Sequence, residues 1–154
     1  DIKSIDISPK AIDCCRLRGL HNAEVLDVLE ETDSFDTLLL LMNGSGIFKS
    51  LEQTPEILAH LKTLVNKNGQ ILVDSSDIKY MYQDEDGGFW MDANSAYYGE
   101  LEYTVRYKNK EDSFLWMYLD FERLKTACAI VGLNCKKVMD GPHHDFLAQI
   151  TLKV

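Results

Sequence analysis

Short apolar runs alternate with amphipathic stretches along the first half of the chain. The apolar runs have the length of β-strands and cover residues 2–7, 23–26, 37–42 and 70–73. Ser8-Pro9 and Thr54-Pro55 each place a hydroxyl side chain before a proline, which is typical of a helix start. Helices are therefore predicted after both pairs, ending near Arg18 and at the Asn68-Gly69 turn. Strands that alternate with helices predict an α/β fold with a parallel sheet.

The run at residues 37–42 shows no alternation of apolar and polar positions, because a threonine is followed by four leucines and a methionine. Such a run is typical of a strand covered on both faces in a parallel sheet. We therefore expect both faces of this strand to be buried.

The second half of the chain departs from this pattern. Residues 78–99 combine acidic, glycine and aromatic residues, which predicts a loop. Apolar and polar positions then alternate over 101–108, a turn is predicted at 109–112, and residues 113–119 form the returning strand of a β-hairpin. The period of two gathers aromatic side chains on one face of this hairpin, and we expect that face to pack on the domain or on a second subunit.

A helix and two strands end the chain. Asp120 is a helix N-cap, and Gly132 ends the helix. Strands are predicted at 133–139 and 146–154. The loop and hairpin at about 78–119 are therefore an insert in an otherwise regular α/β pattern.

Composition and charge narrow the classes of function. The chain has 154 residues, 45% of them hydrophobic, which is enough for one globular domain. Its net charge of −9 repels phosphate backbones and anionic lipid, so we expect no nucleic acid and no membrane as partner. No apolar run approaches the roughly 20 residues of a membrane-spanning helix.

Two further features concern compartment and completeness. The four cysteines show no CxxC spacing, which predicts free thiols in the cytoplasm. The chain opens with Asp1 rather than methionine and enters a strand almost at once. We therefore expect a single domain over 1–154 that is truncated at its N-terminus.

Several segments resemble the strand-end motifs of class I S-adenosylmethionine-dependent methyltransferases. Residues 3–12, Lys-Ser-Ile-Asp-Ile-Ser-Pro-Lys-Ala-Ile, are similar to the family's second strand and the helix after it. Segments 22–27, 35–40 and 64–74 resemble the third, fourth and fifth strand motifs. The resemblance implies an α/β, Rossmann-like, mostly parallel sheet with an antiparallel last strand and an inserted β-hairpin. It also implies that the family's first strand and glycine-rich loop would precede Asp1.

The resemblance implies cofactor-binding residues where the second and third strands end. Asp6 would accept hydrogen bonds from the cofactor ribose, with Ile7 beside it. Asp27 would accept a hydrogen bond from the adenine amino group, and the Val28 backbone N–H would donate to a ring nitrogen. The alternative for Asp6 is that it is a helix cap or merely solvated. The motif at Asp27 is short, and Glu30 could be confused with it.

The segment after the fourth strand would contact the cofactor near the transferred methyl group. Asn43 offers an amide donor and acceptor there, and Gly44 would allow close approach of a ligand to the backbone. For Ser45 and Gly46 an ordinary turn is an equally good interpretation.

Two histidines and an aromatic loop are the candidates for the acceptor side of the site. His143 and His144 lie between the last two strands and could take a proton from a substrate hydroxyl or amine, or could simply be solvated. Tyr80, Tyr82 and Trp90 could wall a substrate pocket, or the loop aromatics could cover the sheet edge. The acidic triplet Asp84-Glu85-Asp86 is a solvated turn in our interpretation, and no metal site is expected.

Together these features predict an S-adenosyl-L-methionine-dependent methyltransferase that acts on a small-molecule acceptor by direct methyl displacement. Alignment and desolvation dominate such catalysis, so few residues reveal it. One alternative is a non-catalytic interaction module that keeps the fold. A less favoured alternative is an NAD(P)-binding Rossmann oxidoreductase, which also uses an acid after its second strand. A homo-oligomer remains open.

Overall fold

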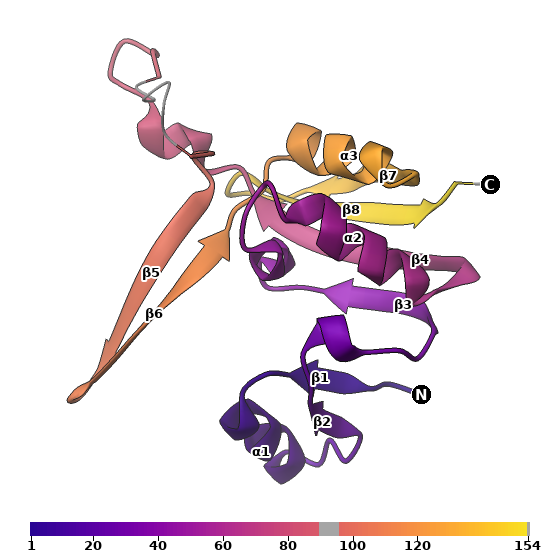
Figure 1. The fold of residues 1–154 in the computed structure, drawn as a ribbon. Helices are drawn as coiled ribbons and strands as arrows, with labels where there is room; N and C mark the ends of the chain where they lie inside the picture. The colour runs from indigo at the N-terminus through magenta and orange to yellow at the C-terminus, as the bar shows by residue number, and fades with distance from the viewer. Residues whose placement is uncertain (90–95, 154) are drawn as a thin grey trace. The chain divides into compact units, whose positions relative to one another are not determined.

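The computed structural model describes residues 1–89 and 96–153, and the chain divides into two compact units, 1–34 and 35–154. Figure 1 shows the first unit in indigo and the second from purple to yellow. Each unit is described by itself.

The first unit is a two-stranded parallel sheet with one helix. It consists of β1 (Ser4–Asp6), α1 (Pro9–Leu17), β2 (Ala23–Val25) and the short 3-10 helix η1 (Val28–Glu30). Ser8 caps α1 because its Oγ accepts a hydrogen bond from the Ala11 amide, and Pro9 occupies the first helical turn, as the sequence predicted.

The second unit is built on a four-stranded sheet in the order β3-β4-β8-β7. Its elements are β3 (Phe35–Leu40), η2 (Gly44–Phe48), α2 (Thr54–Thr63), β4 (Val65–Ser76), η3 (Ile78–Tyr82), α3 (Phe121–Ile130), β7 (Leu133–Asp140) and β8 (Asp145–Leu152). β3 and β4 are parallel, whereas β8 is antiparallel to both of its neighbours, β4 and β7. β3, β4 and β7 therefore run in one direction, and their carboxyl ends share one edge of the sheet.

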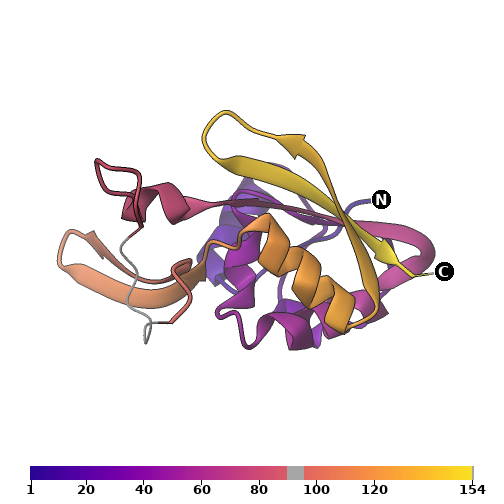
Figure 2. The ribbon, with the colours of Figure 1, turned by 90° about the horizontal axis from the view of Figure 1, so that it is seen from above.

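The core of the second unit lies between this sheet and two helices. Figure 2 shows α2 and α3 on the same face of the sheet. Alternate residues of β4 and β8 point into this core, as do the apolar stripes of both helices. The buried side chains include Leu58, Leu61, Ile71, Val73, Leu124, Cys128, Ala148 and Ile150.

A β-hairpin formed by β5 (Glu100–Tyr107) and β6 (Lys110–Met117) projects from the sheet (Figure 1). Its turn is Lys108-Asn109, with Lys108 at φ 54°, so the predicted turn at 109–112 was wrong. Tyr107 pairs with Lys110, which leaves two residues for the turn and requires the left-handed backbone that such turns use.

The base of this hairpin is joined to the sheet by a buried polar chain. Ser75 Oγ accepts a hydrogen bond from the Leu119 amide at 2.9 Å and lies 2.7 Å from Ser45 Oγ. Ser45 Oγ in turn donates to the Met117 carbonyl at 3.0 Å. Gly99 carries no side chain because a Cβ there would collide with the Tyr118 carbonyl oxygen.

The α/β class, the inserted hairpin and the antiparallel last strand are confirmed, but the described sheets are mixed rather than mostly parallel. The predicted burial of both faces of the strand at 37–42 was wrong. Leu39 in β3 is 61% exposed, because no described element covers that side of the strand. The hairpin face does not pack on the domain at its outer end, where Tyr107 is 73% exposed, because the hairpin extends beyond the sheet. Packing of this face on a second subunit stays a prediction.

Among residues 1–89 and 96–153, no helix has the length and apolar character needed to cross a membrane.

Candidate functional site

The first unit places two aspartates at the carboxyl ends of neighbouring parallel strands. Asp6 ends β1, and its carbonyl oxygen accepts a hydrogen bond from the Leu26 amide at 3.1 Å just beyond β2. Asp27 follows as the N-cap of η1. The two carboxylates therefore share one edge of this sheet, where open α/β sheets bind ligands.

Both aspartates use only one carboxylate oxygen locally. Asp6 Oδ1 accepts a hydrogen bond from the Ser8 amide at 2.7 Å, and Asp27 Oδ1 accepts one from the Leu29 amide at 2.9 Å. The Oδ2 atoms have no hydrogen-bond partner among the described residues. The capping interpretation thus holds for one oxygen of each side chain, and the other can still accept a hydrogen bond from a ligand. Ile7 is exposed beside Asp6, and Val28 begins η1.

In the second unit, the chain leaves β3 through two consecutive left-handed residues. Met42 has φ 68° and Asn43 has φ 59°, a conformation that asparagine tolerates better than methionine. Asn43 Nδ2 donates to the Met117 carbonyl at 3.0 Å, which fixes the amide orientation and leaves Asn43 Oδ1 buried without a hydrogen-bond partner. The backbone N–H of Gly44 donates to Asp74 Oδ1 at 3.0 Å.

The small residues after Asn43 are packed against protein. A Cβ on Gly44 would lie 2.7 Å from Leu40 Cβ, and a Cβ on Gly46 would enter the Trp116 ring. Ser45 is fully buried. Close approach of protein atoms, rather than of a ligand alone, thus accounts for both glycines.

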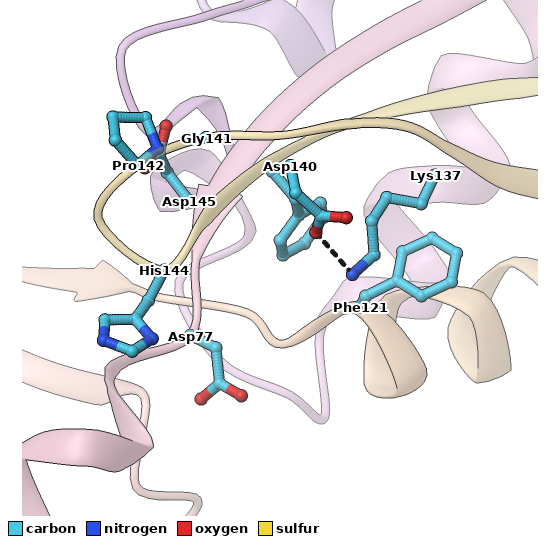
Figure 3. Close-up of a pocket in the computed structure, with 9 residues that line it drawn as sticks. Asp77, Phe121, Lys137, Asp140, Gly141, Pro142, His144 and Asp145 are labelled. Carbon is cyan, nitrogen blue, oxygen red and sulfur yellow. Dashed lines mark hydrogen bonds and ion pairs between the residues drawn. The ribbon is translucent and has the colours of Figure 1, made fainter.

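A cavity of about 390 Å³ lies farther along the same edge of the four-stranded sheet (Figure 3). It lies between the end of β4, the start of α3 and the β7–β8 turn. Its lining residues are Asp77, Phe121, Lys137, Asp140, Gly141, Pro142, His144, Asp145 and Phe146.

Lys137 is the lysine that lines this cavity, and its ammonium group contacts three neighbouring side chains. Its Nζ lies 2.8 Å from Asp140 Oδ1. The same ammonium group lies 5.3 Å from the Phe121 ring centre and 5.7 Å from that of Phe146. Ion-pair and cation–π contacts therefore both engage it.

The structure separates the two candidate histidines. His144 lines the cavity with φ 62°, its carbonyl oxygen accepts a hydrogen bond from the Asp77 amide at 2.8 Å, and its ring stacks on Tyr80 at 4.5 Å. His143 is exposed and does not line the cavity, and its backbone N–H donates to Asp145 Oδ1. Of the two imidazoles, that of His144 can meet a ligand in this cavity.

The aromatic candidates of the loop have different positions. Tyr80 belongs to the stack with His144, whereas Tyr82 donates from its hydroxyl to the Tyr98 carbonyl at 3.2 Å. Trp90 lies outside the described residues.

Sequence reasoning did not select Asp77, although it directly follows β4 at the edge where parallel strands end. Its Oδ1 accepts a hydrogen bond from the Tyr98 hydroxyl at 2.8 Å, and that hydroxyl also lies 3.2 Å from Asp120 Oδ2. Tyr97 donates to the same Asp120 oxygen at 2.6 Å. Burial, followed by these hydrogen bonds, raises the pKa of both tyrosines far above the ordinary value, so both hydroxyls stay protonated.

Solved methyltransferase structures are similar to this chain. An S-adenosylmethionine-dependent methyltransferase from Bacteroides fragilis, solved in complex with S-adenosyl-L-homocysteine, is 38% identical over 100% of this chain, with a TM-score of 0.92. The chain spans 64% of the length of that protein. No protein-family model matches the sequence, and no curated protein matches it.

More distant structures share the fold. DesVI from Streptomyces venezuelae is 15% identical, with a TM-score of 0.69 over 99% of this chain and 75% of its own. The sugar N-methyltransferase KedS8 from Streptoalloteichus is 12% identical, with a TM-score of 0.62 over 97% of this chain and 70% of its own.

Proposed function

We propose that this chain, which has the class I S-adenosylmethionine-dependent methyltransferase fold, belongs to an enzyme that methylates a small-molecule acceptor. The observation that carries the proposal is the 38% identity, over the whole chain, to a methyltransferase solved with S-adenosyl-L-homocysteine. The activity of the complete protein is part of this proposal because the chain spans 64% of that relative.

The cofactor would be S-adenosyl-L-methionine, held in part by Asp6 and Asp27. Each carboxylate keeps one oxygen that can accept a hydrogen bond, which suits ribose hydroxyls at Asp6 and the adenine amino group at Asp27. Ile7 and the Val28 backbone complete this part of the proposed site.

Asn43 and Gly44 would lie near the methionine part of the cofactor. Both lie in the turn that leaves β3, and hydrogen bonds to Met117 and Asp74 fix their positions. The cofactor would supply an electrophilic methyl group on its sulfonium sulfur, and that sulfur would keep the carbon–sulfur electron pair as a neutral thioether when the acceptor's lone pair forms the new bond to the methyl carbon.

On the acceptor side, His144 would take the proton that the acceptor loses. The stack on Tyr80 holds its ring at the cavity, so the imidazole orientation is set before a ligand arrives. Tyr80 and Tyr82 would form part of the acceptor wall, and Trp90 remains a candidate on sequence grounds. His143 lies on the same turn and is the second candidate for this proton-accepting role.

We also propose that residues 1–154 belong to one methyltransferase-like domain. β1 and β3 each have an unpaired edge among the described residues. The unpaired backbone N–H and C=O groups of each edge can pair with a further strand.

Calorimetric titration of S-adenosyl-L-homocysteine into the full-length protein tests this function, with NAD as the control ligand. We expect dissociation constants of about micromolar for the first and no binding of the second. Asp6→Asn should weaken binding at least about tenfold. The asparagine Oδ1 can still accept the hydrogen bond from the Ser8 backbone amide, but its side-chain NH2 group cannot accept one from a ribose hydroxyl. Asp13→Asn, on the exposed surface of α1, is the matched control. A folded protein that binds NAD, or binds neither ligand, overturns the proposal.

A further inference from the structure

We propose that Asp77 recognises the methyl acceptor and that this acceptor is a small amine, bound as its ammonium form. The inference rests on the proposed function, because it takes the cavity beside β4 as the acceptor site. It adds a residue and a substrate class that the cofactor site does not define.

The Asp77 carboxylate is held in one orientation. Its Oδ1 accepts hydrogen bonds from the Tyr98 hydroxyl at 2.8 Å and from the Lys79 amide at 2.9 Å. Its Oδ2 has no hydrogen-bond partner among the described residues. A carboxylate fixed through one oxygen presents the other to a ligand at little entropic cost.

Charge at the cavity favours a cation. Lys137 is already paired with Asp140, whereas no lysine, arginine or histidine of the described residues forms an ion pair with Asp77 or Asp145. Asp145 Oδ1 accepts a hydrogen bond from the His143 backbone amide and its Oδ2 lies against Gly141, whereas Asp77 is fixed by two hydrogen bonds to a single oxygen. Figure 3 shows the Asp77 carboxylate and the His144 ring projecting away from the Lys137–Asp140 pair.

The walls suit an ammonium group on a small apolar body. The His144 ring, stacked on Tyr80, forms one wall. Phe121 meets Phe146 edge-to-face at 5.7 Å between ring centres and forms another. Lys137 already contacts both phenylalanine rings, so this wall suits the apolar body of the ligand, and a cavity of about 390 Å³ accommodates a compact ligand.

The same arrangement lets the bound amine become a nucleophile. An ammonium nitrogen has no lone pair, so it must first release one proton, and His144 is the group in the cavity that takes it. The freed lone pair then forms the nitrogen–methyl bond, while the carbon–sulfur pair stays on sulfur. The methylated amine leaves as a cation, and the proton on His144 passes to water.

Binding of three matched probes tests this inference without methyl transfer. Benzylamine, benzyl alcohol and benzoate have similar shapes but carry positive, zero and negative charge at pH 7. We expect benzylamine alone to shift the amide and side-chain NMR signals of Asp77, Phe121, His144 and Phe146 in the full-length protein. Asp77→Asn, which keeps both hydrogen bonds to Oδ1, should weaken this binding at least tenfold, whereas Asp112→Asn on the exposed hairpin should not.

Equal binding of benzyl alcohol or benzoate, or unchanged benzylamine binding by Asp77→Asn, overturns the inference. The S-adenosyl-L-homocysteine titration distinguishes failure of the proposed function from failure of the amine site. Loss of cofactor binding with retained, Asp77-dependent amine binding refutes the methyltransferase proposal and not the amine site. Cofactor binding without amine binding refutes the amine site alone.

Discussion

The two units of the chain differ in how much of their apolar surface they bury for themselves. Residues 35–154 form a continuous core between a four-stranded sheet and two helices. In residues 1–34, Ile12 and Ala23 are the buried apolar side chains, while Leu17 is 87% exposed. Strands of three residues bury little, so polar contacts contribute a larger share of this unit's stability.

The most prominent of these contacts is a cluster around Lys3. Its Nζ lies 2.7 Å from Glu31, 3.3 Å from Asp33 and 3.5 Å from Glu24, and Glu31 is only 4% exposed. The unit that carries the proposed ribose and adenine contacts is therefore the one with less buried apolar surface to stabilise it. Ligand-binding elements often belong to the least stable part of a protein, because binding can then order them.

Core truncation should produce the largest contrast between the units. Leu58→Ala removes a fully buried side chain of α2 and should lower the free energy of unfolding of residues 35–154 by about 2–5 kcal/mol. Leu17→Ala on α1 should change stability by no more than about 0.5 kcal/mol. Denaturant titration followed by hydrogen exchange measures both, and similar effects at the two positions would contradict the contrast.

Cofactor binding should reduce the difference in stability between the two units. When free S-adenosyl-L-homocysteine is at a hundred times its dissociation constant, binding adds about 2.7 kcal/mol to the free energy of any opening that releases the ligand. Hydrogen exchange of amides that need such an opening should slow about a hundredfold. We expect this slowing at the Ser4 and Leu26 amides, which hydrogen-bond within the small sheet. Amides of β8 should change much less, and equal protection in both sheets would show that the ligand does not act through the first unit.

Acid should weaken the first unit selectively. The Lys3 ammonium, through a hydrogen bond, holds the pKa of Glu31 below its ordinary value of 4.5. Because the folded-state pKa is lowered, the stabilisation is complete above pH 4.5 and is lost as the pH falls through the folded value. Exchange in residues 1–34, corrected for intrinsic rates, should accelerate severalfold in that range. Glu31→Gln should abolish the pH dependence, and Glu30→Gln should retain it.

Alkali should produce the smallest effect, at the hairpin of the second unit. A hydrogen bond with Tyr103, 3.1 Å away, and then burial raise the pKa of Tyr118 to about 12 from 10.0. The stabilisation is therefore present below pH 10 and is lost as the pH rises through 12. NMR titration of labelled tyrosine should show the pKa of Tyr118 moving toward 10 in Tyr103→Phe and staying in place in Tyr107→Phe.

The fold was largely predictable because its signals are local. Proline after a hydroxyl residue marked the start of α1, and alternation at 101–107 marked β5. Exposure of Leu39 was not predictable, since four leucines in a row show that a strand is apolar but not what covers it. The hairpin turn at Lys108-Asn109 was misplaced because neither residue is glycine.

The positions of the candidate site residues were predictable only where strand ends define them. Asp6, Asp27 and Asn43 each follow a strand, and the structure places them there. Asp77 also follows a strand, but its significance depends on Tyr98, 21 residues away, and on the β7–β8 turn. Contacts of this kind arise from tertiary packing, which spacing in the sequence does not encode.

The serine pair at the base of the hairpin makes the insert modular. Ser75 Oγ accepts hydrogen bonds from the Leu119 amide and from Ser45 Oγ, and the Ser45 hydroxyl is shared between Ser75 Oγ and the Met117 carbonyl. This buried attachment reaches the residue pair Glu100–Met117, and the Trp116 ring of the next pair packs against Gly46. The outer hairpin can therefore be shortened, lengthened or exchanged for another two-stranded segment while the scaffold keeps its own hydrogen bonds, which makes this position a natural place for grafting.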